Sequence, residues 1–131
     1  MKRIRTASIW LLWVGLAVGL VACAPGAANS AATRPEAAGD PIAGQELFAS
    51  KCGACHGPEG AGLPGLGKPV TNSAFIAGKT DIELVEFIKQ GRAPGDPLNT
   101  TGVAMPPKGG NPTLDDQNLL DIVAYLRALQ D

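Results

Sequence analysis

The segment Cys52-Gly53-Ala54-Cys55-His56 constrains this chain more than any other part of its sequence. Two thiols three positions apart, followed directly by an imidazole, form the Cys-x-x-Cys-His pattern of haem c attachment. Each thiol can add to one vinyl group of the same porphyrin, and the next residue can then ligate the iron. His56 is the only histidine of the 131 residues. The pattern therefore predicts one covalent haem c, bound through Cys52 and Cys55, with His56 as an axial iron ligand.

A second axial ligand is available at Met105, the only methionine besides Met1, which is followed by two prolines. A thioether is a soft ligand, and His/Met ligation raises the reduction potential of a haem iron. An iron with both axial positions filled by the protein does not readily bind oxygen or peroxide, so we expect it to exchange single electrons. If Met105 merely packs, the site is open, and a haem sensor or peroxidase is the alternative.

A Cys-x-x-Cys pair also occurs in zinc sites and in redox dithiols. A four-ligand zinc site would need further Cys or His ligands nearby, and apart from His56 the sequence has none near this pair. A thiol–disulfide oxidoreductase would have a strand before the pair and a parallel sheet after it. Here a helix-like segment leads in, and no run of Val and Ile follows. The haem site is therefore favoured, with an exported thiol–disulfide oxidoreductase as the alternative.

The first 22 residues have the pattern of an export signal. Three basic residues among the first five precede an apolar run over 9–22, whose 14 residues are short for a membrane-spanning helix of about 20. The run ends in Leu20-Val21-Ala22-Cys23, which resembles the lipobox of bacterial lipoproteins. That resemblance implies cleavage before Cys23 and lipidation of this residue. An uncleaved anchor helix that ends in a spare cysteine is the alternative.

We therefore expect three parts: a signal peptide over 1–22, a lipidated Cys23 with a flexible Ala/Pro/Gly linker over 23–39, and one domain over 40–131. The linker has no periodic apolar face and suits a tether. After cleavage the chain would carry 8 basic and 12 acidic side chains, a formal charge of −4. This charge argues against a nucleic-acid partner. The expected location is the extracytoplasmic face of a bacterial membrane, with a lipid anchor.

Three helices are predicted in the domain, and no stretch alternates as a strand would. The first begins after the N-cap Asp40. The second extends from a capping box formed by Thr80 and Glu83 to Gly91 and places on one face Ile82, Val85 and Ile88. The third opens with Thr113 and has at helical spacing Leu119, Ile122, Val123, Leu126 and Leu129. The predicted fold class is all-α.

In this order, the motifs make 40–131 resemble the class I cytochrome c domain, a small fold of three main helices around a covalent haem. In that family the N-terminal and C-terminal helices cross. The resemblance places Gly44 and Phe48 on one side of this crossing and Ile122 and Tyr125 on the other. Gly44 has no side chain and would let the two helices approach closely.

The resemblance also assigns a role to Pro64-Gly65-Leu66, which follows His56 at the distance of the family's Pro-x-Leu segment. It implies that the Pro64 carbonyl accepts a hydrogen bond from His56 Nδ1 and that Leu66 packs on the haem. An ordinary Gly/Pro loop is the alternative. Candidates for hydrogen bonds to the haem propionates are Thr71-Asn72-Ser73, Asn99-Thr100-Thr101 and Arg92. Candidates for the rim of the haem edge are Lys51, Lys68 and Lys108.

The predicted function is that of a membrane-tethered mono-haem c-type cytochrome that transfers single electrons between respiratory or photosynthetic redox partners, without being an enzyme itself. Its partners would be redox proteins and, through the lipid, the bilayer. It would act either as a shuttle or as a subunit of a respiratory complex. The layout of lipobox, linker and single domain is similar to that of the mono-haem lipoprotein subunits of alternative complex III.

Overall fold

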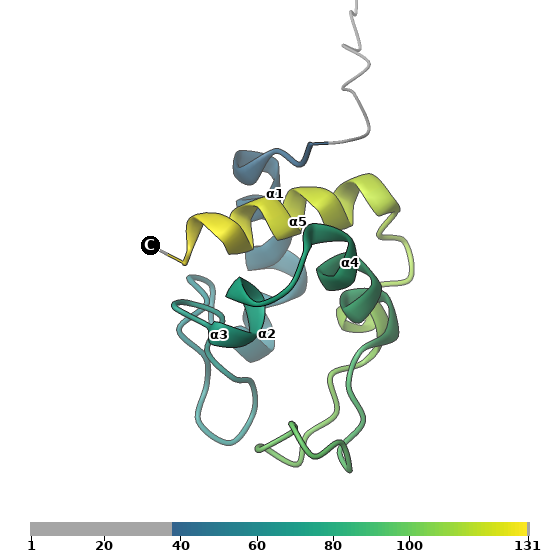
Figure 1. Ribbon diagram of the computed structural model, residues 1–131. Helices are drawn as coiled ribbons and strands as arrows, with labels where there is room; N and C mark the ends of the chain where they lie inside the picture. Colours follow the sequence, from purple (N-terminus) through teal and green to yellow (C-terminus); the bar gives the residue numbers. More distant parts are fainter. Residues whose placement is uncertain (1–37, 131) are drawn as a thin grey trace, which may run out of the picture. The chain divides into compact units, whose positions relative to one another are not determined.

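The computed structural model describes residues 38–130, so the predictions for the signal peptide, for Cys23 and for most of the linker lie outside the described residues. The described part is helical, and its elements are α1 (Pro41–Lys51), α2 (Gly53–His56), α3 (Ala74–Ala77), α4 (Asp81–Gln90), the 3₁₀ helix η1 (Pro107–Gly110) and α5 (Asp116–Ala128). Figure 1 shows α5 passing across α1, with α4 beside them and long loops below. Within 38–130 there is no strand, only two isolated bridges. The prediction of an all-α fold is confirmed.

Helix α1 begins as predicted and leads directly into the Cys-x-x-Cys-His segment. The Asp40 carboxylate accepts a hydrogen bond from Ile42 N–H at 2.9 Å, and Pro41 follows at the first helical position. Cys52 ends α1 and is also the residue from which α2 starts. The position of α1 therefore decides where both cysteines and His56 lie.

The crossing of α1 and α5 is a direct contact between two backbones. A Cβ atom on Gly44 would lie 1.9 Å from the Asp121 carbonyl oxygen, which no real side chain could tolerate. Further along the crossing, the buried rings of Phe48 and Tyr125 lie 5.4 Å apart between centroids. The predicted crossing, with Gly44 as its closest point, agrees with the structure.

Helix α4 has the predicted capping box. Thr80 Oγ1 accepts from Glu83 N–H at 3.3 Å, and the Glu83 carboxylate accepts from Thr80 N–H at 2.7 Å. Its apolar face differs from the prediction, because Ile82 is 66% exposed whereas Leu84 is buried with Val85 and Ile88. The prediction for Ile82 is wrong. Helical spacing allows either set of residues, and packing against α5 and the cavity selects the face that includes Leu84.

Helix α5 begins later than predicted, because Asp115 rather than Thr113 caps it. The Asp115 carboxylate accepts from Asn118 N–H at 2.8 Å, and Asn118 Oδ1 accepts in return from Asp115 N–H at 3.2 Å. Aspartate caps a helix better than threonine does, and here its partner completes the reciprocal pair. Leu114, just before the cap, is buried together with Leu119, at the spacing of a hydrophobic staple.

The hydrophobic core lies where α1, α4 and α5 meet. Its fully buried members are Phe48, Leu84, Leu119, Ile122 and Val123. Four of the five predicted apolar positions of α5 belong to this core, and the fifth, Leu129, is half-buried against it. Between residues 38 and 130, no helix has both the length and the apolar character that crossing a membrane requires.

Candidate haem site

The apolar core opens on one side into a cavity of about 450 Å³, within the range of about 300–1,000 Å³ that ligand pockets occupy. The cavity lies between the end of α1, α2, α3, α4, α5 and the loops on either side of Met105. Core side chains that also form its wall are Phe48, Leu84, Ile88, Ile122 and Leu126. The wall is therefore mainly apolar, and the core has one face with no protein packed on it.

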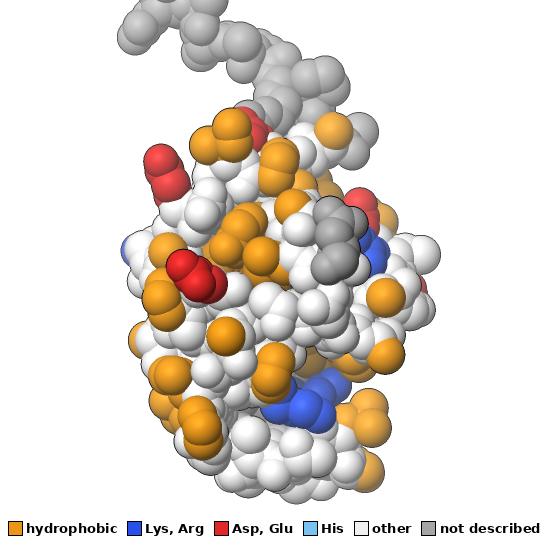
Figure 2. Space-filling view, turned by 90° about the vertical axis from the view of Figure 1, so that its left-hand side faces the viewer, with side chains coloured by type: hydrophobic (Ala, Val, Ile, Leu, Met, Phe, Trp, Pro, Cys, Tyr) orange, Lys and Arg blue, Asp and Glu red, His pale blue; other side chains and the backbone are white. Residues whose placement is uncertain are grey.

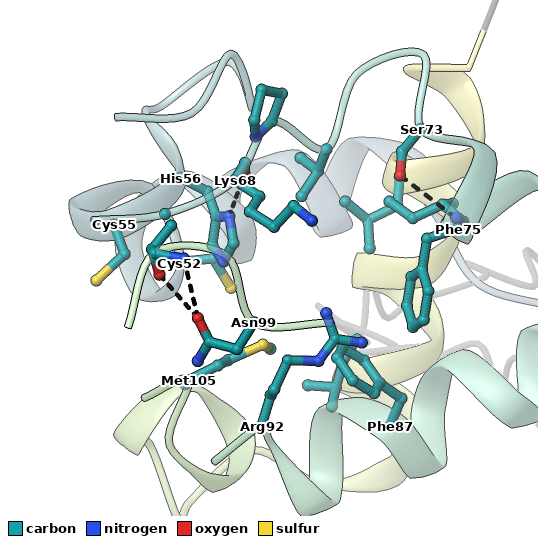
Figure 3. Close-up of a pocket in the computed structure, with 18 of the residues that line it drawn as sticks. Cys52, Cys55, His56, Lys68, Ser73, Phe75, Phe87, Arg92, Asn99 and Met105 are labelled. Carbon is teal, nitrogen blue, oxygen red and sulfur yellow. Dashed lines mark hydrogen bonds between the residues drawn. The ribbon is translucent and has the colours of Figure 1, made fainter. Parts of the chain in front are cut away.

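The Cys-x-x-Cys-His segment forms one wall of this cavity. His56 Nδ1 lies 2.8 Å from the Lys68 carbonyl oxygen, so the ring donates here when its proton is on Nδ1. This bond fixes the orientation of the ring and leaves Nε2 with a lone pair for a metal ion. Figure 3 shows His56 and Met105 on opposite walls, with the sulfur of Met105 pointing into the cavity.

The hydrogen-bond partner predicted for His56, the Pro64 carbonyl, is wrong. Leu63 and Gly67 exchange both backbone hydrogen bonds, at 2.9 and 3.1 Å, and form a tight turn with Pro64 and Gly65 at its tip. This turn places Pro64 on the surface and away from the cavity lining, while the chain that leaves it brings the Lys68 carbonyl to the imidazole. Leu66 does line the cavity, although it is 37% exposed.

The two cysteines are free thiols in different surroundings. Burial raises the pKa of the Cys52 thiol to about 11, and the neighbouring Cys55 adds to this rise. Cys55 is exposed, and in Figure 3 its sulfur points away from that of Cys52. A thiol–disulfide oxidoreductase needs a nucleophilic thiol with a lowered pKa. The environment of Cys52 therefore argues against that alternative.

Met105 is half-buried against the core and is attached to the end of α4. Its N–H donates to the Arg92 carbonyl at 2.9 Å, and its carbonyl accepts from Arg92 N–H at 2.7 Å. The loop between these residues is organised by Asn99, whose side chain donates to the carbonyls of Ala93 and Val103 at 3.0 and 2.8 Å. The backbone that carries Met105 is thus held at several points.

All charged side chains that line the cavity, among the described residues, are cationic: Lys51, Lys68 and Arg92. Lys68 Nζ and Arg92 Nη1 both donate to the Leu98 carbonyl, at 3.5 and 3.4 Å, so two cations from separate loops meet at one wall. The buried Arg92 Nε has no hydrogen-bond partner, and the nearest carboxylate oxygen, on Asp96, is 3.7 Å away. On the face drawn in Figure 2, one cluster of lysine and arginine side chains lies in a recess beside hydrophobic groups.

The polar clusters named from the sequence reach the cavity only in part. Ser73, Asn99 and Thr101 line it, whereas Thr71, Asn72 and Thr100 do not. Lys108 is not among the lining residues either, because its Nζ donates to the Leu114 carbonyl at 2.6 Å. The prediction that Lys108 lies at the rim is therefore wrong, while Lys51 and Lys68 do lie there.

These features together suit a flat, mainly apolar group with negative charges at one edge. The cavity offers two thiols, an imidazole with a free Nε2, a thioether on the opposite wall and a cationic side without carboxylates. Haem c has these properties, and Cys, His and Met are its usual partners in proteins. Fold and site therefore define a small all-α protein of the c-type haem class.

The chain belongs to the cytochrome c family, whose family model, Cytochrome c, matches residues 42–130. Domains of this family carry covalently attached haem c and serve in electron transfer, so the cofactor of this class I domain is haem c.

Three relatives illustrate the match. Cytochrome c-555 of Chlorobaculum thiosulfatiphilum is 31% identical over 87 residues, which cover 66% of this chain and 93% of the relative. Cytochrome c4 of Azotobacter vinelandii is 35% identical over 92 residues, which cover 68% of this chain and 40% of the relative. The cbb3-type cytochrome c oxidase subunit FixP of Bradyrhizobium sp. (strain ORS 278) is 40% identical over 55 residues, 41% of this chain and 19% of the relative. The matched part of this chain thus spans less than half the length of cytochrome c4 and of FixP. No solved structure matches it significantly.

Three residues contribute to the site through their backbones, and the sequence carries no side-chain signal for these contacts. Lys68 acts on His56 through its carbonyl, which every residue type possesses. Gly91 and Arg92 contact Met105 through their backbones, and the close approach at Gly91 depends on a pairing across the loop. The glycine at the end of α4 is visible in the sequence, but it reads there as a helix terminator.

Proposed function

We propose that this chain is a mono-haem c-type cytochrome that passes single electrons between redox proteins. Cys52 and Cys55 would hold the haem covalently, and His56 and Met105 would ligate its iron. The bound group supplies an iron that gains or loses one electron. The observation that carries the proposal is the placement of His56 and Met105 on opposite walls of one apolar cavity.

The chain's own residues would hold the two proposed ligands in place and limit their contact with water. The Lys68 carbonyl holds the His56 ring through the bond of 2.8 Å, and the pairing with Arg92 holds the backbone of Met105. The thioether favours the ferrous state, and the apolar wall, with Leu66 at its edge, limits the access of water. If His56 and Met105 both ligate the iron, no position is left open for a small molecule, which disfavours the sensor or peroxidase alternative. The cations Lys68 and Arg92 would balance the charge of the propionates, and the neutral Ser73, Asn99 and Thr101 would add polar groups nearby.

Redox partners would dock at the loops around the cavity. Six large hydrophobic side chains are the most exposed among the described residues, and four of them belong to these loops: Leu63, Leu66, Leu98 and Val103. Exposed apolar groups that gather in one region are typical of interaction surfaces. The protein would be an electron carrier without substrate chemistry of its own, whether it acts as a shuttle or as a subunit of an oxidoreductase complex.

The proposed tether is the N-terminal part. Residues 1–22 would be the signal peptide, Cys23 the lipidated residue and 23–39 the linker that joins the lipid to the domain over 40–131. This arrangement supports a lipid-anchored position on the extracytoplasmic face of a bacterial membrane. The similarity in layout to the lipoprotein subunit of alternative complex III, and the match to FixP, an oxidase subunit, favour membership of a respiratory complex.

The role of Met105 is tested with Met105→Ala in the holoprotein. Wild-type ferric protein should show the weak near-infrared sulfur-to-iron charge-transfer band. The variant should lose this band, bind cyanide when oxidised and carbon monoxide when reduced, and have a lower reduction potential, because a soft ligand of ferrous iron is removed. Met105→His is the control: it should remain low-spin, also with a lower potential. Rapid carbon monoxide binding by the reduced wild type would favour the open-site sensor or peroxidase.

Haem that stays with the chain on a denaturing gel would exclude the thiol–disulfide oxidoreductase.

A further inference from the structure

The pairing between Arg92 and Met105 closes the loop over 93–104 at its base. It consists of the two backbone hydrogen bonds of 2.7 and 2.9 Å and is an isolated antiparallel bridge. The bridge joins the backbone of Met105 to Arg92, two residues after the end of α4, while the loop between them is exposed along much of its length. Any change in the bridge would therefore be passed to the methionine.

Gly91 is the residue that lets this bridge form at such close range. Its φ is +71°, in the region that side chains disfavour. A Cβ atom here would lie 2.2 Å from the Met105 carbonyl oxygen and 2.8 Å from the Pro106 carbonyl carbon. Both are backbone atoms, which cannot rotate away as the end of a side chain can. A larger residue must therefore push 105–106 away from the end of α4.

The bridge residue Arg92, which follows the end of α4, is held by its side chain. The Arg92 guanidinium lies 4.8 Å from the ring centroids of both Phe75 and Phe87, a distance at which cation–π attraction operates. These two rings pack edge to face at 4.9 Å. Figure 3 shows the guanidinium beside the labelled aromatic rings at one end of the cavity. With Arg92 held in this way, a collision at Gly91 would displace the methionine segment rather than the helix end.

We propose that Gly91 is a positioning residue for the sulfur of Met105. The absence of a side chain at Gly91 sets how far the Met105 backbone stands from α4, and thereby how far the thioether reaches into the cavity. This inference rests on the proposed role of Met105 as an iron ligand. Gly91 lies 14 positions before Met105 in the chain, and its role would be to keep the thioether where it can ligate the iron.

The test compares Gly91→Ala with Gly102→Ala in the holoprotein. Gly102 has nearly the same φ, +73°, but nothing lies within 4 Å of the position of its Cβ. Both variants thus place a side chain on backbone with a φ near +70°, and only Gly91→Ala meets the Met105 backbone. We expect Gly91→Ala to weaken the charge-transfer band, to lower the reduction potential and to bind cyanide at least about tenfold faster than wild type. Gly102→Ala should keep the wild-type band and rate.

The outcomes separate the two proposals. A wild-type protein without the charge-transfer band would contradict Met105 as a ligand and remove the basis of the inference. A wild-type band that survives unchanged in Gly91→Ala would contradict the inference alone, and so would equal effects of the two variants. If Gly91→Ala yields no folded holoprotein, amide hydrogen exchange of the wild type decides. Slow exchange at both Arg92 and Met105 supports the bridge, and fast exchange at either overturns it.

Discussion

Two backbone features position the side chains on the opposite walls of the cavity. They are the carbonyl group of Lys68 and the absence of a side chain at Gly91. His56 depends on the first through a bond of 2.8 Å, and Met105 depends on the second through a close backbone contact. Neither role requires a functional side chain. At the scale of the residue, main-chain atoms therefore largely set the positions of the two proposed iron ligands.

Gly44 is a third residue that acts through the lack of a side chain. Gly44→Ala would place a Cβ 1.9 Å from the Asp121 carbonyl oxygen and force α1 and α5 apart. We expect the free energy of unfolding of the ferric holoprotein to fall by about 1–3 kcal/mol or more, as overpacking does elsewhere. Denaturant titration measures this change. Gly95→Ala, with open space at its Cβ, is the matched control and should stay within about 0.5 kcal/mol of wild type. Equal stability of the two variants would contradict a tight crossing.

At the scale of the element, the helices begin where side chains satisfy their free N–H groups. Asp40, Thr80 and Asp115 cap α1, α4 and α5, and the last two form reciprocal boxes. Each cap stands immediately before a segment that delivers residues to the cavity. The caps therefore fix where along the chain each wall of the site begins.

The capping box of α4 predicts a pH dependence of stability. The backbone N–H of Thr80, followed by its side chain, lowers the pKa of Glu83 below its ordinary value of 4.5. Because the folded-state pKa is the lower one, the contribution of Glu83 is present above pH 4.5 and is lost as the pH falls through the folded-state pKa. Glu83→Gln should therefore be less stable than wild type near neutral pH, and the difference should shrink in acid. Chemical unfolding at a series of pH values measures it, and a constant difference would contradict the box.

At the scale of the whole molecule, the core is incomplete without the cofactor. One domain of about 90 residues buries limited apolar surface, and here several core side chains also form the wall of an open cavity. A covalently held haem would fill this space and supply the missing apolar contacts. The same group would thus serve both the stability of the fold and its proposed electron transfer.

The proposed anchor is tested on the full-length chain with Cys23→Ser. The variant should no longer be processed as a lipoprotein, because the thiol that would carry the lipid is absent. Mature wild-type protein should remain in the membrane and show no tryptophan emission, since Trp10 and Trp13 both precede the expected cut. Tryptophan emission from purified protein would favour the uncleaved anchor.

Gentle solubilisation of the membrane distinguishes a shuttle from a subunit of a complex, because only a subunit should co-purify with other chains.

The family, the all-α class and the start of two helices could be predicted from the amino-acid sequence. These depend on covalent chemistry and on contacts within one helical turn: the spacing of the Cys-x-x-Cys-His segment, the cap at Asp40 and the box at Thr80. The signal peptide and the lipidation of Cys23 stay predictions. The tertiary structure decided which carbonyl meets His56, which face of α4 is buried and what holds Met105. A tight turn moves Pro64 to the surface, packing selects Leu84 over Ile82, and a bridge across a loop brings Gly91 to the methionine. Such contacts join residues that are far apart in the chain, and local sequence patterns therefore do not predict them.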